Sequence, residues 1–325
     1  MLTITVAALV TPSYTCSGNP LTPATNTARW IHRGLLPELA ANLRRRRRPP
    51  QTQRQPAPPL RHAASDAPPN ALALVTGATG GIGSAICLQL ASSGFDVIVA
   101  ARNASAAAVV VDTIRASGGR ATYERLDLDN ATAADGPVAL SRRLRGRPIA
   151  LLVNNAGTMG GPVGQTLRVN CVGPVALTLA LYPNLVAARG GACVINVGSS
   201  SHLRASTVRG AADSRRPDLG LGAYAISKLG LMHFSLRLRD AVGSRGTVRV
   251  VDAHPGMVWT PMLRGYMGEP ACRALVWTGL SNRLFRTAAE GAQAILAART
   301  FSPDSTAASG AASPYFVDGR PSVAG

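Results

Sequence analysis

A tyrosine and a lysine four positions apart, Tyr224 and Lys228, give the strongest chemical signal in the sequence. They lie in the run YAISK, and positions i and i+4 share one face of a helix, so the phenol and the ammonium group point to the same place. A nearby ammonium group favours the phenolate, so we expect it to lower the tyrosine pKa from about 10. Such a phenol can act as an acid or base near neutrality. Lys228 is the single lysine among 34 basic residues, the others being arginine. A lysine at this one position, in a chain that otherwise uses arginine, indicates a role that needs a compact ammonium group.

A glycine-rich run, TGATGGIG at 76–83, lies between an apolar segment (71–76) and a helical pattern (82–93). Glycines allow a tight turn and let backbone N–H groups approach a pyrophosphate at a helix N-terminus. A strand–turn–helix context supports this interpretation over a plain glycine-rich loop. The predicted cofactor contacts of this turn are Gly77, Thr79, Gly81, Ile82 and Gly83.

An arginine, Arg102, follows the second predicted strand (96–101). NAD sites usually place an acidic residue there for the ribose 2′-hydroxyl, and the sequence has none at this strand end. An arginine can instead bind a 2′-phosphate through a forked, charge-assisted contact. The sequence therefore favours NADP(H), the alternative being an ordinary exposed arginine in an arginine-rich chain.

Five motifs in order make the chain similar to the short-chain dehydrogenase/reductase family. They are TGATGGIG at 76–83, NNAG at 154–157, SSS at 199–201, YAISK at 224–228 and HPGMVWT at 254–260. The resemblance covers residues 71–325 and points to the retinol dehydrogenase-like and WW-domain-oxidoreductase-like subgroup. It implies an NADP-dependent enzyme that interconverts an alcohol and a carbonyl by hydride transfer.

The resemblance also implies roles for individual residues. The catalytic residues would be Asn170, Ser199, Tyr224 and Lys228. Further cofactor contacts would come from Asp127 at the adenine, from Asn154 and Ala156 along the adenosine ribose, from Tyr224 and Lys228, and from Pro255, Gly256, Val258 and Thr260 beside the nicotinamide. Asn154 would also stabilise the sheet. The chemistry agrees, because a carbonyl that accepts hydride develops negative charge that the two hydroxyl groups of Ser199 and Tyr224 can stabilise.

One segment departs from the family pattern. Only fifteen residues separate Asn155 from Asn170, about ten fewer than is usual in the family. Either residues 158–167 form a genuine short loop, or sequence has been lost from the gene model. Asn170 is therefore the least secure catalytic assignment, the alternative being an asparagine at a helix start with no catalytic role.

The elements that position these residues alternate along the chain. We predict strands at 71–76, 96–101, 121–126, 149–153, 192–197 and 248–253, and helices at 82–93, 104–117, 169–187 and 223–242. This alternation predicts an α/β fold with a Rossmann-type, doubly wound parallel sheet of about seven strands in a single domain. Residues 203–222 are polar and arginine-rich, and we expect them to form an exposed loop on the substrate side.

Residues 1–70 differ from the remainder of the chain. They contain five consecutive arginines (44–48), a Pro/Gln/Arg tract, and two acidic residues. This composition predicts a disordered basic segment. Because it is rich in arginine and poor in acids, it is typical of a transit peptide, which would direct the chain to a plastid or mitochondrion. A basic tail or a wrongly assigned start are the alternatives, and would leave the domain cytoplasmic.

The composition narrows the other possibilities. No apolar run reaches the roughly 18–20 residues of a membrane-spanning helix. The five cysteines have no metal-site spacing, and we interpret them as free thiols in a reducing compartment. We predict no metal and no nucleic-acid partner, since no aromatic residues interleave the arginine run. A non-catalytic NADP-binding scaffold or sensor remains the alternative function. The resemblance is compatible with a homodimer or homotetramer, and the substrate and direction stay open.

Overall fold

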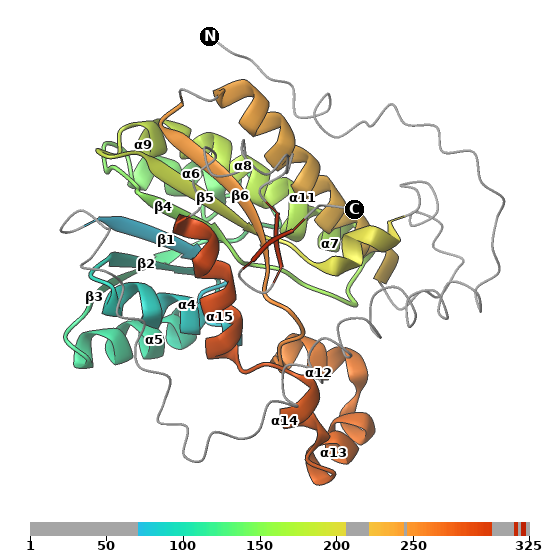
Figure 1. The fold of residues 1–325 in the computed structure, drawn as a ribbon. Helices are drawn as coiled ribbons and strands as arrows, with labels where there is room; N and C mark the ends of the chain where they lie inside the picture. Colours follow the sequence, from blue (N-terminus) through green and yellow to red (C-terminus); the bar gives the residue numbers. More distant parts are fainter. Residues whose placement is uncertain (1–70, 206–220, 244–245, 301–314, 318–319, 323–325) are drawn as a thin grey trace, which may run out of the picture.

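Parallel strands form the centre of the computed structural model, which describes residues 71–205, 221–243, 246–300, 315–317 and 320–322 (Figure 1). The strands are β1 (Leu72–Thr76), β2 (Asp96–Ala101), β3 (Arg120–Arg125), β4 (Leu151–Asn154), β5 (Ala192–Val197), β6 (Val248–His254), β7 (Tyr315–Val317) and β8 (Arg320–Ser322). Their order is β3-β2-β1-β4-β5-β6-β7-β8. The predicted doubly wound sheet of seven parallel strands is confirmed. The sequence did not predict β8, which pairs antiparallel with β7.

The central strands are apolar along most of their length because helices cover both faces of the sheet. Every residue of β1, β4 and β5 is buried. An antiparallel sheet with one solvent-exposed face would instead alternate apolar and polar residues along each strand. The continuous apolar runs that predicted these strands thus reflect burial from both sides.

Helices form the two outer layers, and further helices project beyond them. The helices are α4 (Gly81–Ser92), α5 (Ala104–Ala116), α6 (Pro137–Arg143), α7 (Val163–Leu167), α8 (Gly173–Ala180), α9 (Tyr182–Val186), α11 (Leu221–Val242), α12 (Pro261–Met267), α13 (Glu269–Trp277), α14 (Leu280–Leu284) and α15 (Ala288–Ala297). Helices α4, α5 and α15 share one core cluster with the sheet, and α6, α8, α9 and α11 share the other. Helices α12, α13 and α14 project beyond these two layers (Figure 1). Among the helices that the structure describes, none combines the length and apolar character needed to cross a bilayer.

The strand order reverses between β1 and β4, which are hydrogen-bonded neighbours in the sheet. The chain leaving β1 continues into α4 on one face of the sheet, and the chain leaving β4 continues toward α8 on the other face. In open α/β sheets, ligands bind at this kind of topological switch point. The fold therefore predicts the location of the site before any side chain is considered.

The single helix predicted at 169–187 is wrong in detail, because the structure has three pieces there. A π-helical turn (η2, Arg168–Val172) leads into α8, and α9 follows. Pro174 has no N–H to donate to the carbonyl of Asn170, so an α-helical hydrogen bond is lost. The N–H of Gly173 donates instead to the carbonyl of Arg168, five residues back. The predicted basic segment 1–70 and most of the predicted loop 203–222 lie outside the described residues.

Candidate active site

The glycine turn after β1 packs directly on the turn after β4. Gly77 has φ +61°, and a Cβ there would lie 2.7 Å from Ala156 Cα. A Cβ on Gly83 would lie 2.2 Å from the Gly77 carbonyl oxygen. Only glycine fits either position, because a side chain would push apart the two backbone segments. The structure therefore brings together Gly77, Gly83 and Ala156, as the sequence predicted.

The side chain of Thr76 joins the same two turns. Its Oγ1 accepts hydrogen bonds from the backbone N–H groups of Asn155 at 3.1 Å and Ala156 at 3.0 Å. Asn155 Nδ2 donates in return to the carbonyl oxygens of Thr76 at 2.9 Å and Gly77 at 3.2 Å. These reciprocal bonds fix the turn after β1 and the turn after β4 relative to each other at the switch point.

The N-terminus of α4 is open to an anion. Gly80 occupies the N-cap position, no side chain caps the helix, and the first turn contains no acidic residue. The N–H groups at such an end and the helix dipole both favour a phosphate. The residues present therefore fit the pyrophosphate of a dinucleotide. The cofactor contacts of Thr79, Gly81 and Ile82 stay predictions.

The remaining predicted cofactor residues follow β2 and β3. Arg102 is exposed at the end of β2, and the next residue, Asn103, caps α5 by accepting from Ala106 N at 3.0 Å. Asp127 follows β3, and its Oδ1 accepts from Asp129 N at 3.0 Å. These positions lie beyond adjacent strand ends, where the adenosine half of a dinucleotide binds in this fold.

Tyr224 and Lys228 lie one turn apart on α11, and both are buried. Lys228 Nζ is 5.6 Å from the centre of the Tyr224 ring, and it donates to the Val197 carbonyl oxygen at 2.8 Å. Val197 is the last residue of β5, so the strand end holds the ammonium group beside the phenol. The predicted pairing of these two side chains is confirmed.

The predicted direction of the Tyr224 pKa shift is wrong for this structure. Burial raises the pKa of Tyr224 above its ordinary value, and interaction with the Ser199 side chain opposes the rise. Burial also lowers the pKa of Lys228 to about 8, while Cys171 raises it. Desolvation disfavours the charged form of each group, and it is the largest cause of both shifts. At neutral pH Tyr224 therefore keeps its proton.

Ser199 follows β5 by two residues and begins a 3₁₀ turn (η3, Ser200–Arg204). Its Oγ donates to Ser201 Oγ at 3.1 Å and accepts from Ser201 N at 3.2 Å. His202 Nδ1 is 2.6 Å from the Ser199 carbonyl oxygen, and burial lowers the pKa of His202. A neutral imidazole with its proton on Nδ1 therefore fixes the turn that presents the serine.

Asn170 reaches the site despite the short segment before it. Its side chain is fully buried; Oδ1 accepts from Thr158 N at 2.8 Å, and Nδ2 donates to Thr158 O at 2.8 Å and to Ser227 Oγ at 3.1 Å. A Cβ on Gly157 would lie 3.5 Å from Asn170 Oδ1 and 3.8 Å from Lys228 Nζ. The π-helical turn thus places Asn170 near Lys228. Turns of this kind are frequent at functional sites.

Asn154 stabilises the sheet, as predicted. Its Nδ2 donates to Thr178 Oγ1 at 3.0 Å and to Asn196 Oδ1 at 2.8 Å, and its side chain is buried. Both amide hydrogens are therefore used within the fold. A contact of Asn154 with the adenosine ribose stays a prediction.

The segment after β6 meets the glycine turn. A Cβ on Gly81 would lie 3.7 Å from Pro261 Cδ and 3.8 Å from Thr260 Cγ2. Thr260 also caps α12 by accepting from Leu263 N at 3.3 Å. Pro255, Gly256 (φ +78°) and Val258 lead into this contact. Of the four predicted nicotinamide residues, the structure therefore brings Thr260 to the glycine turn, whereas Pro255 and Val258 lie against Gly291 of α15.

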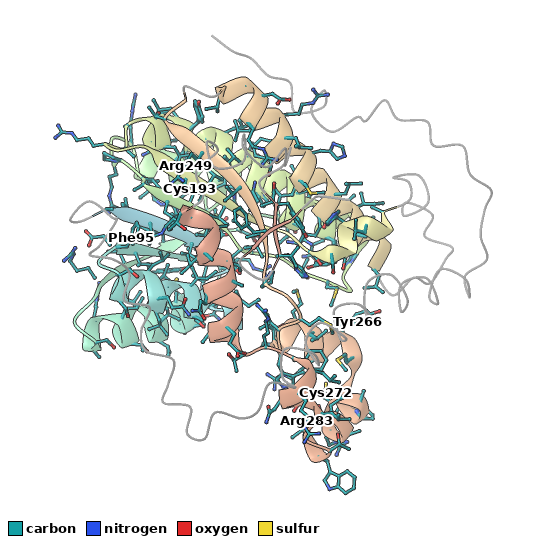
Figure 2. The ribbon with its side chains drawn as sticks, in the orientation of Figure 1. Phe95, Cys193, Arg249, Tyr266, Cys272 and Arg283 are labelled. Carbon is teal, nitrogen blue, oxygen red and sulfur yellow. The ribbon has the colours of Figure 1, made fainter. Side chains whose placement is uncertain are left out.

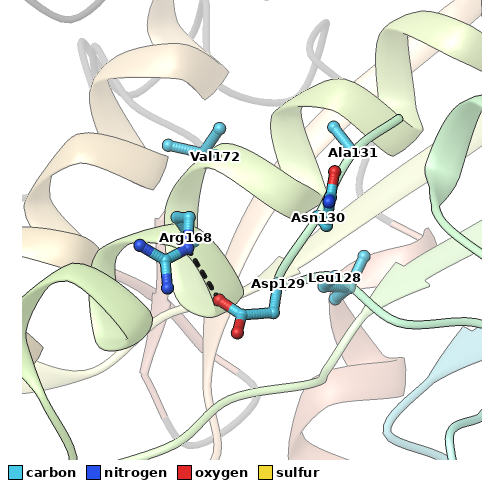
Figure 3. Close-up of a pocket in the computed structure, with 6 residues that line it drawn as sticks. All are labelled: Leu128, Asp129, Asn130, Ala131, Arg168 and Val172. Atoms are coloured by element: carbon cyan, nitrogen blue, oxygen red, sulfur yellow. Dashed lines mark hydrogen bonds and ion pairs between the residues drawn. The ribbon is translucent and has the colours of Figure 1, made fainter. Parts of the chain in front are cut away.

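A hollow of about 410 Å³ lies between the loop after β3 and the π-helical turn (Figure 3). Arg168 and Asp129 form an ion pair across it at 2.8 Å. Asp129 is two residues from Asp127, and Arg168 is two residues from Asn170. The pair therefore ties the loop at the predicted adenine site to the segment that carries Asn170.

Sequence reasoning did not single out Thr76, Asn155, Ser227 or Val197. Three of these lie inside the quoted motifs, so their spacing could have identified them. Val197 acts through its backbone carbonyl, which no residue type reveals.

The comparisons with known proteins agree with this geometry. A model of the short chain dehydrogenase family matches residues 71–270. Mouse polyprenol dehydrogenase is 38% identical over 239 residues, which are 69% of this chain and 70% of that protein. Human retinol dehydrogenase 12 is 30% identical over 245 residues, 70% of this chain and 72% of that protein. The angucycline C-6 ketoreductase LanV with bound NADP has a TM-score of 0.55 and 26% identity, and covers 76% of this chain and 93% of its own. Other matched structures hold NADPH or NAD.

Proposed function

The chain belongs to the short-chain dehydrogenase/reductase family, and on that premise we propose that it is an NADP(H)-dependent oxidoreductase that interconverts an alcohol and a carbonyl. The observation that carries the proposal is the meeting of Ser199, Tyr224, Lys228 and Asn170 at the carboxyl ends of the central strands. Bound NADPH supplies the hydride in the reductive direction. The side chains of this protein stabilise the charge on the carbonyl oxygen and transfer the proton.

The hydroxyl groups of Ser199 and Tyr224 face the carbonyl oxygen in this proposal. Charge that develops on the oxygen is stabilised by two donors that are already held in place. Tyr224 keeps its proton at neutral pH and can give it to that oxygen. Lys228, fixed by Val197 O, is placed to bind the nicotinamide ribose and to stabilise the phenolate that remains.

Arg102 supports NADP(H) over NAD(H). It is exposed beyond β2, where a 2′-phosphate would lie, and no acidic residue follows this strand directly. A guanidinium group can bind a phosphate with two parallel hydrogen bonds. One matched structure contains NADP and another contains NAD, so the comparisons do not decide between the two cofactors. The proposed preference for NADP(H) therefore rests on Arg102 and on the lack of an acidic residue directly after β2.

The testing experiment is a fluorescence titration of the full-length chain with NADPH and with NADH. We expect tighter binding of NADPH, and Arg102→Ala should weaken it by roughly tenfold or more with little effect on NADH. Arg145→Ala, on the exposed end of the segment after α6, is the matched control. Tighter NADH binding would refute the cofactor choice, and a folded chain that bound neither would refute the dehydrogenase.

The proposed substrates are lipophilic alcohols and aldehydes or ketones. The names of two relatives, polyprenol dehydrogenase and retinol dehydrogenase 12, support this class. A panel of prenyl aldehydes and short polar carbonyls tests it through NADPH oxidation. Preference for the short polar carbonyls would contradict it.

We also propose that residues 1–70 direct the chain to a plastid or mitochondrion. Their arginine-rich, acid-poor composition supports this assignment. A fluorescent reporter fused to residues 1–70 should enter one of these organelles. A reporter that stays in the cytoplasm would exclude targeting by this segment.

A further inference from the structure

Helices α12, α13 and α14 form a lobe outside the two helical layers (Figure 1). Its two ends meet at one point, because Trp259 N donates to Arg286 O at 2.9 Å and Arg286 N donates to Met257 O at 2.7 Å. Within the three helices only Cys272 and Ser281 are buried. The lobe therefore presents nearly all of its surface to its surroundings.

Large apolar side chains gather on this lobe. Trp277 is 89% exposed and Val276 is 59% exposed, while Met262 and Leu280 are exposed to about 40%. These are four of the ten exposed large apolar residues in the described part of the chain. Single exposed apolar residues are ordinary, but a group on one projecting element marks a contact site. Trp277, the last residue of α13, is the largest and most exposed side chain of this group.

The lobe's charges favour one kind of partner. Arg264, Arg273 and Arg283 are exposed, and Glu269 is the only acidic residue of the three helices. Arg273 lies 3.7 Å from Glu269, so part of the positive charge is balanced locally. Figure 2 labels Cys272 and Arg283 on the projecting lobe. Apolar side chains with a tryptophan, flanked by arginines, are typical of a surface that lies in the interface of an anionic membrane.

A second copy of the chain fits this surface less well. A two-fold contact would place the same patch against itself, with arginines facing arginines. The net charge of +18 adds a general repulsion between copies. An anionic bilayer accepts the apolar side chains and the arginines at once. We infer that the α12–α14 lobe docks on the surface of an anionic lipid bilayer, with Trp277 and Val276 inserted at the headgroup level.

The lobe adjoins the proposed active site. A cavity of about 930 Å³ between α12 and α13 is lined by Trp259, next to Thr260, and by Trp277 at the exposed end. A lipophilic substrate dissolved in the bilayer would meet this cavity on the docked face. That consequence rests on the proposed function, whereas the docking itself does not.

Vesicle co-sedimentation of the full-length chain tests the docking. Vesicles of phosphatidylcholine alone are compared with vesicles that also contain phosphatidylserine. We expect binding to the anionic vesicles and roughly tenfold weaker binding of the double variant Val276→Ser, Trp277→Ser, because less apolar area is inserted. Val109→Ser removes an apolar side chain that is 67% exposed on α5, and should change nothing. Residues 1–70 are identical in all variants, so any binding by them cancels in the comparison.

A second pair of variants separates charge from apolar insertion. Arg273→Gln with Arg283→Gln should weaken binding to the phosphatidylserine vesicles several-fold, and Arg145→Gln should not. NADPH titration of each variant reports whether its fold is intact, independently of lipid and of turnover. Equal vesicle binding by the parent and the Val276/Trp277 variant would overturn the docking. A loss of oligomers in that variant by light scattering would instead assign the surface to contact between copies.

Discussion

The side-chain amide of Asn170 donates to Ser227 Oγ at 3.1 Å, and so connects the π-helical turn to the helix that carries Tyr224 and Lys228. Ser227 Oγ donates in turn to the Tyr224 carbonyl oxygen at 2.7 Å. The other groups of the Asn170 amide are used by the backbone of Thr158. One buried asparagine therefore fixes the loop after β4 and the catalytic helix relative to each other.

Replacing Asn170 should damage both stability and turnover. In Asn170→Ala, the partly buried N–H and carbonyl of Thr158 lose their partner, as does the buried Ser227 Oγ. We expect unfolding to become easier by about 2–3 kcal/mol. Urea denaturation measures this change, with Asn130→Ala as the control, because Asn130 is exposed and its side chain accepts only exposed hydrogen bonds from Thr132. We expect kcat to fall at least tenfold in the Asn170 variant, since Lys228 loses a fixed neighbour. Unchanged kcat and stability would show that the short segment does not position the site.

Replacing Tyr224 should abolish turnover and spare cofactor binding. Tyr224→Phe removes only the hydroxyl group, so carbonyl reduction should fall by roughly 10²–10⁴-fold. NADPH titration of this variant should stay close to that of the parent. Tyr182→Phe, on α9 in the outer layer, is the matched control. Full activity in Tyr224→Phe would exclude the proposed acid, and an inactive parent that bound NADPH would favour a scaffold.

The pH dependence should differ between the two directions of the reaction. Because burial raises the pKa of Tyr224, the protonated form needed for reduction persists through neutral pH, and this rate should be flat there. Alcohol oxidation needs the phenolate, so its kcat/KM should keep rising between about pH 7 and 9. A plateau of oxidation near pH 7 would indicate instead the lowered pKa that the lysine spacing predicts.

Lys228 should impose a second pH effect, on cofactor binding. Burial lowers the pKa of its ammonium group to about 8, so the positive charge is lost as the pH rises through that value. NADPH affinity should therefore fall above about pH 8. In Lys228→Arg the positive charge persists at high pH, so NADPH affinity should not fall further above pH 8. At pH 7 this variant should bind NADPH more weakly than the parent, because a guanidinium group does not replace a compact ammonium group. A parent affinity that stayed constant to pH 10 would contradict the shift.

Much of the fold could be predicted because burial on both faces gives the strands their apolar runs. The predicted strands 96–101 and 192–197 coincide with β2 and β5. The lobe α12–α14 was not predicted from the sequence, and its helices pack mainly on one another. The broken helix at 169–187 depended on Pro174, whose effect on the Asn170 carbonyl is visible only with the π-turn in view.

The proximity of Tyr224 and Lys228 could also be predicted, because residues four positions apart share one face of a helix. The direction of the Tyr224 pKa shift could not. The spacing of Tyr224 and Lys228 shows that they are neighbours, but their pKa values depend on desolvation, and burial is a property of the folded chain.

A buried polar network crosses three neighbouring strands behind the active site, and it provides the last prediction. Asn154, Asn196 and Asp252 are register partners on β4, β5 and β6. Ser235 on α11 joins two of them, because its Oγ accepts from Asn196 Nδ2 at 2.8 Å and donates to Asp252 Oδ1 at 2.7 Å. Arg239 donates to Asp252 Oδ2 at 3.2 Å.

Ser235→Ala should therefore destabilise the protein although it creates only a small cavity. The change removes the partner of Asn196 Nδ2 and the partner of Asp252 Oδ1 in a buried site, while Arg239 still binds Asp252 Oδ2. We expect a loss of about 2–3 kcal/mol. Burial already raises the pKa of Asp252 to about 6, and the Ser235 hydrogen bond lowers it, so the variant should raise this pKa further. A raised pKa means that the folded state binds the extra proton. The stability deficit of the variant should thus be larger at pH 7.5 than at pH 5.

Urea denaturation at the two pH values measures this difference in stability deficit, with Ser105→Ala, exposed on α5, as the control. Equal deficits at both pH values would show that Ser235 does not stabilise the charged carboxylate.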